Sequence, residues 1–198
     1  MHIVLSDFMS LDGVVQSPGA QGEDTDGGFA HGGWSMRYFE PETMGPAVTE
    51  TMASTDALLF GRRTWQTMAA AWPTRAGDPF ADRMNEMPKY VASRTLTRDD
   101  LTWPGSTLLP ANDATGAIGA IRELREQDGG AIQVMGSASL AAQLIEHDLV
   151  DEYRLMIEPV LLGGGKRVFP DDGRARALEL VSATTTGTGV LICTYRRV

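Results

Sequence analysis

Three segments far apart in the chain place glycine, arginine, serine and threonine directly after a short apolar run. They are Gly61-Arg62-Arg63-Thr64, Ser93-Arg94-Thr95 and Gly136-Ser137-Ala138-Ser139. Each apolar run has the length of a buried strand, and open α/β sheets bind ligands just outside the carboxyl ends of their strands. Arginine and hydroxyl side chains donate hydrogen bonds to phosphate oxygens. The three segments therefore predict one long anionic ligand that lies across a sheet edge.

The first segment places two cations at the start of an expected helix that runs from Arg62 to about Trp72. The N-terminal end of a helix carries partial positive charge, so each cation in the first turn costs about 0.3–1 kcal/mol. A bound anion would remove this cost and accept charge-assisted hydrogen bonds. Two arginines that are solvated at the surface and screened by water are the alternative.

The charge balance limits the classes of partner. The chain has 198 residues, with 17 Lys and Arg against 26 Asp and Glu, and a formal net charge of −9. Nucleic-acid binding needs a basic surface, so nucleic acid is not an expected partner. Local arginines on an acidic protein favour a small anionic ligand instead.

The chain carries no pattern of a membrane or metal protein. No apolar run approaches the ~20 residues of a membrane span, and residues 1–7 enter a strand without the regions of a signal peptide. We therefore expect a cytoplasmic protein without a membrane partner. Cys193 is the only cysteine, which excludes an internal disulfide and a cysteine metal cluster. Its place in an apolar strand indicates buried filler.

The hydrophobic pattern predicts a single domain over residues 1–198, in which strands and helices alternate. Residues 131–159 have the pattern of a βαβ unit. The expected fold is α/β, with a mostly parallel sheet flanked by helices and an antiparallel C-terminal edge. Expected strands cover residues 2–9, 56–60, 89–93, 107–109, 131–135, 151–159, 178–186 and 189–197. Expected helices cover residues 41–54, 62–72, 80–86 and 139–147, with one more that starts after an N-cap at Asp113 and ends near residue 128.

Two further features concern the surface. Residues 16–33 have no periodicity, and such a long loop is typical of a lid or a binding loop. The run Gly163-Gly164-Gly165-Lys166-Arg167 lacks the full P-loop pattern, so it indicates a glycine turn that contacts this loop. Because the edges of sheets need cover, a homodimer through the antiparallel C-terminal edge is a hypothesis.

The order and spacing of the motifs resemble the dihydrofolate-reductase-like superfamily over essentially the whole chain. The closer resemblance is to stand-alone relatives of the reductase domain of riboflavin biosynthesis. It rests on residues 10–13 (Ser-Leu-Asp-Gly), 61–65, 93–95, 135–137 and 159–165, together with Phe169. The resemblance implies a three-layer fold and an NADPH-dependent reductase of a small heterocycle, most like the pyrimidine reductase of that pathway. A non-catalytic nucleotide-binding module and a dihydrofolate reductase proper are the alternatives.

The resemblance also implies roles for the three segments. Gly61 and Gly136 would allow close backbone approach, and Thr64 would cap its helix or contact phosphate. The nicotinamide would lie near Asp12 and Val15. The adenosine 2′-phosphate of NADPH would be held by Arg62, Arg63, Ser93, Arg94 and Thr95, and the pyrophosphate by Gly136, Ser137, Ala138 and Ser139.

The candidate catalytic residues are Asp12 and Glu158. Asp12 could equally cap the backbone of its own turn, which is a common use of Asp before Gly. Glu158 lies near the end of an expected strand and could equally be a solvated carboxylate. The pathway substrate carries a ribose phosphate, and only Arg37 and Lys166 are candidates to bind it. The substrate therefore stays open.

Overall fold

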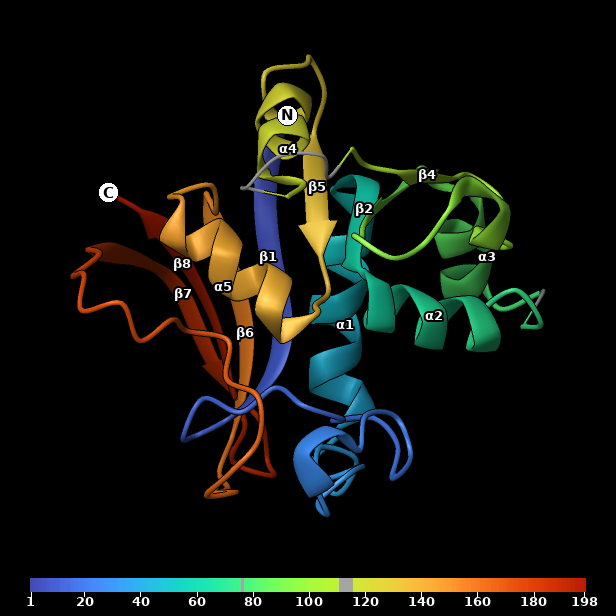
Figure 1. Ribbon diagram of the computed structural model, residues 1–198. Coiled ribbons are helices and arrows are strands. Elements are labelled where there is room, and N and C mark those ends of the chain that lie inside the picture. Colours follow the sequence, from blue (N-terminus) through green and yellow to red (C-terminus); the bar gives the residue numbers. More distant parts are fainter. Residues whose placement is uncertain (76, 111–115) are drawn as a thin grey trace.

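A computed structural model describes residues 1–75, 77–110 and 116–198 (Figure 1). Its strands form one eight-stranded sheet in the order β4-β3-β2-β5-β1-β6-β8-β7. Strands β1 to β6 run parallel, whereas β8 pairs antiparallel with both β6 and β7. The strands are β1 (His2–Ser10), β2 (Thr55–Gly61), β3 (Lys89–Ala92), β4 (Ser106–Leu108), β5 (Ala131–Val134), β6 (Glu152–Glu158), β7 (Leu178–Thr185) and β8 (Leu191–Arg197). The predicted mostly parallel sheet with an antiparallel C-terminal edge is confirmed.

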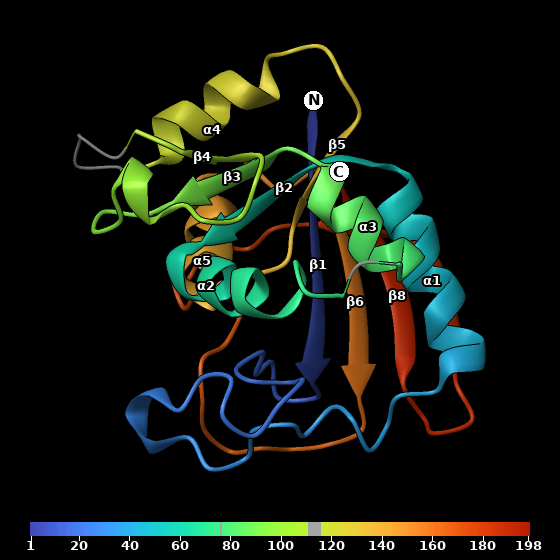
Figure 2. The same cartoon turned by 90° about the vertical axis from the view of Figure 1, so that its right-hand side faces the viewer.

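Helices cover both faces of the sheet, which gives three layers. Figure 2 shows α1 and α3 on one side of the sheet and α4 and α5 on the other. Trp65 of α2 packs in the same apolar cluster as Met52 of α1 and Met84 of α3. The helices are α1 (Pro41–Ala53), α2 (Arg62–Ala71), α3 (Pro79–Glu86), α4 (Ile118–Arg125) and α5 (Ala138–Glu146). The predicted N-cap Asp113 lies outside the described residues, and α4 is described from Ile118.

The predicted βαβ unit is present with one addition. Strands β5 and β6 flank β1 in the sheet, and both pair with it in parallel. The connection through α5 therefore crosses over β1 instead of joining two adjacent strands. This insertion puts β1 inside the sheet, and because β5 ends opposite Leu5, the segment after β5 begins beside the middle of β1.

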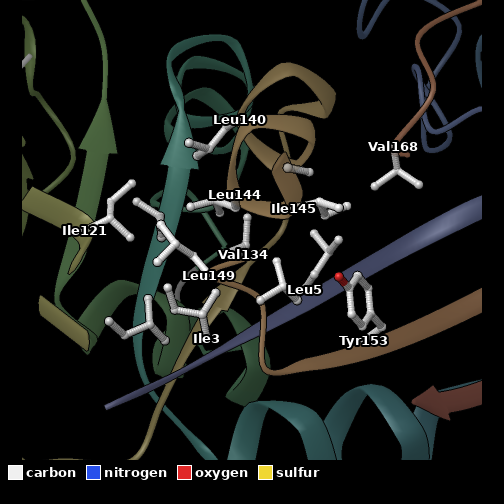
Figure 3. Close-up of a cluster of buried hydrophobic side chains, with 14 of the residues drawn as sticks. Ile3, Leu5, Ile121, Val134, Leu140, Leu144, Ile145, Leu149, Tyr153 and Val168 are labelled. Carbon is white, nitrogen blue, oxygen red and sulfur yellow. The ribbon is translucent and has the colours of Figure 1, made fainter. Parts of the chain in front are cut away.

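The largest apolar cluster lies between the sheet and the pair α4 and α5 (Figure 3). In β1, side chains alternate between the faces of the sheet, so Ile3, Leu5, Asp7 and Met9 share a face. Ile3, Leu5 and Met9 are buried in this cluster. Asp7 is the polar exception in the row, and it lies close to the carboxyl end of the strand.

Strand β7 is an open edge of the sheet. All eight of its residues are exposed, including Leu180 at 54% and Val181 at 44%. It has neither the proline nor the lysine that commonly protects such edges. We propose that β7 pairs with β7 of a second copy of this chain. As far as the chain is described, no helix is long and apolar enough to cross a bilayer.

If the protein is a dimer through β7, one substitution in this strand should halve its molar mass in solution. Wild-type protein is expected to elute as a dimer in size-exclusion chromatography with light scattering, and Val181→Glu as a monomer, because the charge would be buried at the interface. Leu161→Glu is the matched control, since Leu161 is 71% exposed but lies outside β7. A monomeric wild-type protein contradicts the proposal.

Candidate functional site

The three predicted segments line one cleft of about 1570 Å³. They follow β2, β3 and β5, which are parallel, so their carboxyl ends meet at one edge of the sheet. The structure thereby brings together every candidate for cofactor binding. The cleft is lined by Val15, Gly61, Arg62, Arg63, Thr64, Ser93, Arg94, Thr95, Gly136, Ser137, Ala138 and Ser139.

Gly61 and Gly136 allow a close approach between two of these segments. The N–H of Gly61 donates to the carbonyl of Gly136 at 3.2 Å. A Cβ atom on Gly61 would lie 2.2 Å from the Oγ of Ser137, and Gly136 has a φ of +99° that side chains disfavour. The expected reason for these glycines was approach to a ligand. The contacts show that the two segments also approach each other.

The first turn of α2 carries Arg62 and Arg63 and no acidic residue. Among the described residues, Arg62 donates only a long hydrogen bond of 3.3 Å to Gln66, and its side chain lines the cleft. Arg63 is instead paired with two carboxylates of the loop after β1, Asp24 at 3.1 Å and Asp26. The expected role of Arg63 as a free phosphate ligand therefore competes with two ion pairs already present.

The loop over residues 16–33 is anchored across this end of the cleft. Lys166 of the glycine turn also pairs with Asp24 at 2.6 Å and Asp26 at 3.0 Å. Hydrogen bonds from Arg63 and then Lys166 hold the pKa of Asp26 below its usual range. The backbone N–H of Lys166 donates to Gln16 at 3.0 Å. The predicted contact between the glycine turn and this loop is confirmed.

The segment after β3 leaves Arg94 as its exposed cation. The hydroxyl of Ser93 accepts the N–H groups of Thr95 at 3.1 Å and Leu96 at 3.0 Å. Ser93 thus shapes the turn with its side chain. Arg94 is exposed and lines the cleft, as Arg62 does, and the described residues provide no carboxylate that pairs with it.

The start of α5 offers backbone donors to the same cleft. Its N-cap, Ser137, makes no side-chain capping hydrogen bond. The first intrahelical donor is the N–H of Leu140, which bonds to the carbonyl of Ser137 at 3.0 Å. The N–H groups before it are the unpaired donors that any helix presents at its N-terminus. This helix end, Arg62 and Arg94 together fit a ligand with separated phosphate groups.

Asp12 lies outside the cleft lining. Its carboxylate accepts the hydroxyl of Ser10 at 2.7 Å and the backbone N–H groups of Leu162 at 3.1 Å and Gly163 at 2.9 Å. These hydrogen bonds, led by that from Ser10, lower its pKa to about 2. Asp12 therefore joins the turn after β1 to the segment after β6, and its carboxylate is fully engaged there.

Glu158 is completely buried, so the interpretation as a solvated carboxylate is wrong. The hydroxyl of Ser35 donates to its Oε1 at 2.6 Å, and its Oε2 has no partner among the described residues. Burial raises the pKa of Glu158 to about 7. The side chain is not part of the cleft lining, and it packs beneath the segment that contains Ser35.

Asp7 is a cleft residue that the sequence reasoning missed. Its side chain lines the cleft, and its Oδ2 is buried without a hydrogen-bond partner in the described part of the chain. Burial, and then the nearby carboxylate of Glu23, raise its pKa to about 8. The signal was present in the sequence, because Asp7 interrupts the apolar alternation of Ile3, Leu5 and Met9.

The described residues contain no group of three or more His, Cys, Asp or Glu side chains placed to hold a metal ion. Cys193 is buried in β8, as predicted.

The comparisons with known proteins agree with this architecture. Residues 1–192 match the model of the RibD C-terminal domain family. The protein YyaP of Bacillus subtilis is 29% identical over 199 residues, which cover 98% of this chain and 94% of YyaP.

Two solved structures share the fold. A putative riboflavin biosynthesis protein from Shewanella sp. PV-4 superposes with a TM-score of 0.74 at 19% identity, covering 100% of this chain and 99% of that one. A pyrimidine reductase-like protein from Corynebacterium diphtheriae gives a TM-score of 0.69 at 15% identity, covering 100% and 92% of the two chains. With the family match over nearly every residue, the chain belongs to the RibD C-terminal domain family.

Proposed function

We propose that this protein is an NADPH-dependent reductase of a small heterocyclic substrate. The observation that carries the proposal is the convergence of Arg62, Arg94 and the first turn of α5 on one cleft. Membership of the RibD C-terminal domain family supports reductase chemistry. The cofactor would supply the hydride, and the protein would bind and orient the reactants.

The cleft residues divide the binding tasks by their chemistry. Arg62 and Arg94 would hold the 2′-phosphate, because a guanidinium matches the geometry of phosphate oxygens. The free N–H groups at the start of α5 would hold the pyrophosphate. Arg63 would keep the loop in place through Asp24 and Asp26. Val15 also lines the cleft, and the reactive end of the cofactor would lie beside it.

The remaining part of the cleft suits a flat, weakly polar ring. Besides the candidates for cofactor binding, the residues that line the cleft include Phe8, Met36, Phe39, Met156 and Ser35. Flat faces and a few polar groups are typical of sites for heterocycles. A pyrimidine-like ring is therefore the substrate class we propose.

Three cations that line the cleft, Arg154, Arg196 and Lys166, are already paired with carboxylates. Arg154 donates to Glu152 at 2.6 Å, and Arg196 donates to the same carboxylate at 2.9 Å. Lys166 is held by Asp24 and Asp26. Arg37, the other candidate, stacks on Tyr38 and is not among the lining residues. The substrate we propose therefore does not depend on a phosphate for binding.

A fluorescence titration with NADPH and, separately, NADH tests the proposal. We expect clear binding with a strong preference for NADPH, because only NADPH carries the 2′-phosphate. The complex should then consume NADPH in the presence of a pyrimidine or a pterin. Binding of neither cofactor overturns the proposal. Binding without consumption across both substrate classes would instead identify a non-catalytic nucleotide-binding module.

A further inference from the structure

Asp7 occupies a particular place on the central strand. It pairs in register with Leu155 of β6, and both lie on the face of the sheet that α5 covers. Along this face its neighbours in β1 are Leu5 and Met9, which are buried in the apolar cluster. Asp7 nevertheless lines the cleft, as do Val15 and Leu140. A carboxyl group thus stands where an apolar side chain would complete the core.

As far as the chain is described, Asp7 has a like charge near it and no cation paired with it. Glu23 of the loop after β1 is the charged group that acts on it, and the carboxylate of Glu23 is fixed by the N–H groups of Gly19 at 2.9 Å and Ala20 at 3.2 Å. The residues of α5 at the cleft, Ala138, Ser139, Leu140 and Gln143, are all uncharged.

The cations at this end of the cleft are already engaged. Lys166 and Arg63 both pair with Asp24 and Asp26. On β6, Leu155 and Tyr153 present apolar surface on the same face. Buried beside a like charge, the Asp7 carboxyl holds its proton at neutral pH, with a pKa of about 8.

We propose that Asp7 is the proton donor that accompanies hydride transfer in this cleft. The inference rests on the proposed function and adds a residue to it. A C=N or C=O bond of the substrate would gain a hydride at carbon from the reduced cofactor, and its π-electron pair would move to the nitrogen or oxygen. The O–H of Asp7 would then give its proton to that atom. The substrate is reduced, the cofactor is oxidised, and the Asp7 carboxylate regains its proton from water.

The charges of the site favour this pairing of events. An oxidised nicotinamide carries a positive charge and a reduced one does not. A carboxylate beside the oxidised ring is stabilised by its charge, so the proton leaves Asp7 as that charge forms. The same coupling acts without any substrate. If Asp7 lies beside the ring, the affinity for NADP⁺ relative to that for NADPH must rise with pH. Titration of the phosphate groups affects both cofactors equally, so it cancels in the ratio of the two affinities.

The test measures the dissociation constants of NADP⁺ and NADPH from about pH 6 to about pH 9, which spans the expected titration. In the wild-type protein the preference for NADP⁺ is expected to rise by about tenfold, the effect of a one-unit pKa shift, and to level off above a pH of about 8. Asp7→Asn should make the preference independent of pH. The infrared difference spectrum between the wild-type protein and Asp7→Asn at neutral pH should show one protonated carboxyl band that the variant lacks, because the band of Glu158 is common to both proteins and cancels.

A second variant and a control separate the outcomes. Glu23→Gln keeps the acceptor for Gly19 and Ala20 but removes the like charge, so it should move the midpoint to lower pH. Asp128→Asn, on the distant segment after α4, should leave the profile unchanged. Binding of both cofactors with a ratio independent of pH overturns the role of Asp7 and leaves the proposed function standing. Binding of neither overturns both.

Discussion

Replacement of both Arg62 and Arg94 by alanine is expected to raise the dissociation constant for NADPH about hundredfold, because each lost phosphate contact costs about 1.4 kcal/mol, or tenfold. Affinity for NADH should change little, since NADH lacks the 2′-phosphate. Both arginines line the cleft, and within the described part of the chain Arg62 makes only one long hydrogen bond, to Gln66. Fluorescence titration of the variant and the wild-type protein with each cofactor measures the effect.

Arg122→Ala is the matched control for the double variant. Arg122 is an exposed arginine in the last turn of α4 and does not line the cleft. It removes one positive charge, against two in the double variant, and should leave both affinities unchanged. If the double variant binds NADPH as the wild-type protein does, the two segments do not hold the phosphate. Equal losses for NADPH and NADH would instead indicate a general distortion of the cleft.

Replacement of Glu158 by glutamine is expected to weaken the pH dependence of stability. The folded protein holds a proton on Glu158 up to a pH of about 7, whereas the unfolded chain releases it near 4.5. Glu158 therefore favours the folded state most below a pH of 4.5, and this stability is lost as the pH rises through about 7. Each bound proton changes the free energy of unfolding by about 1.4 kcal/mol per pH unit within that window.

Urea unfolding at a series of pH values measures this effect. Asp7 also makes the free energy of unfolding depend on pH, up to a pH of about 8. The quantity to follow is therefore the difference in free energy of unfolding between the wild-type protein and Glu158→Gln. That difference should fall as the pH rises from 4.5 to about 7. Glu123→Gln, at an exposed position of α4, is the control. A difference that is constant over the window would show that Glu158 ionises in the folded protein as it does in the unfolded chain.

Local patterns in the sequence were sufficient for the fold and for the place of the cleft. Apolar runs and helical spacing predicted the elements to within a few residues, as for α1 (Pro41–Ala53) and β6 (Glu152–Glu158). The three turns were found because the carboxyl ends of parallel strands lie at one edge of the sheet. Polar residues of the same types that follow several such strands must therefore lie close together. Periodicity and turn chemistry act over a few neighbouring residues, and such signals can be read along one chain.

The tertiary structure decided which side chains are protonated and which are held in ion pairs or hydrogen bonds. Arg63 meets Asp24, and Asp12 meets Gly163, across long stretches of sequence. Nothing local in the sequence indicates either pair. The burial of Glu158 beneath Ser35 likewise depends on how a distant loop packs. Whether a carboxyl is ionised depends on all the charge and solvent around it in three dimensions. The sequence by itself therefore determined the fold and the cleft, and packing decided which of its acids keep a proton.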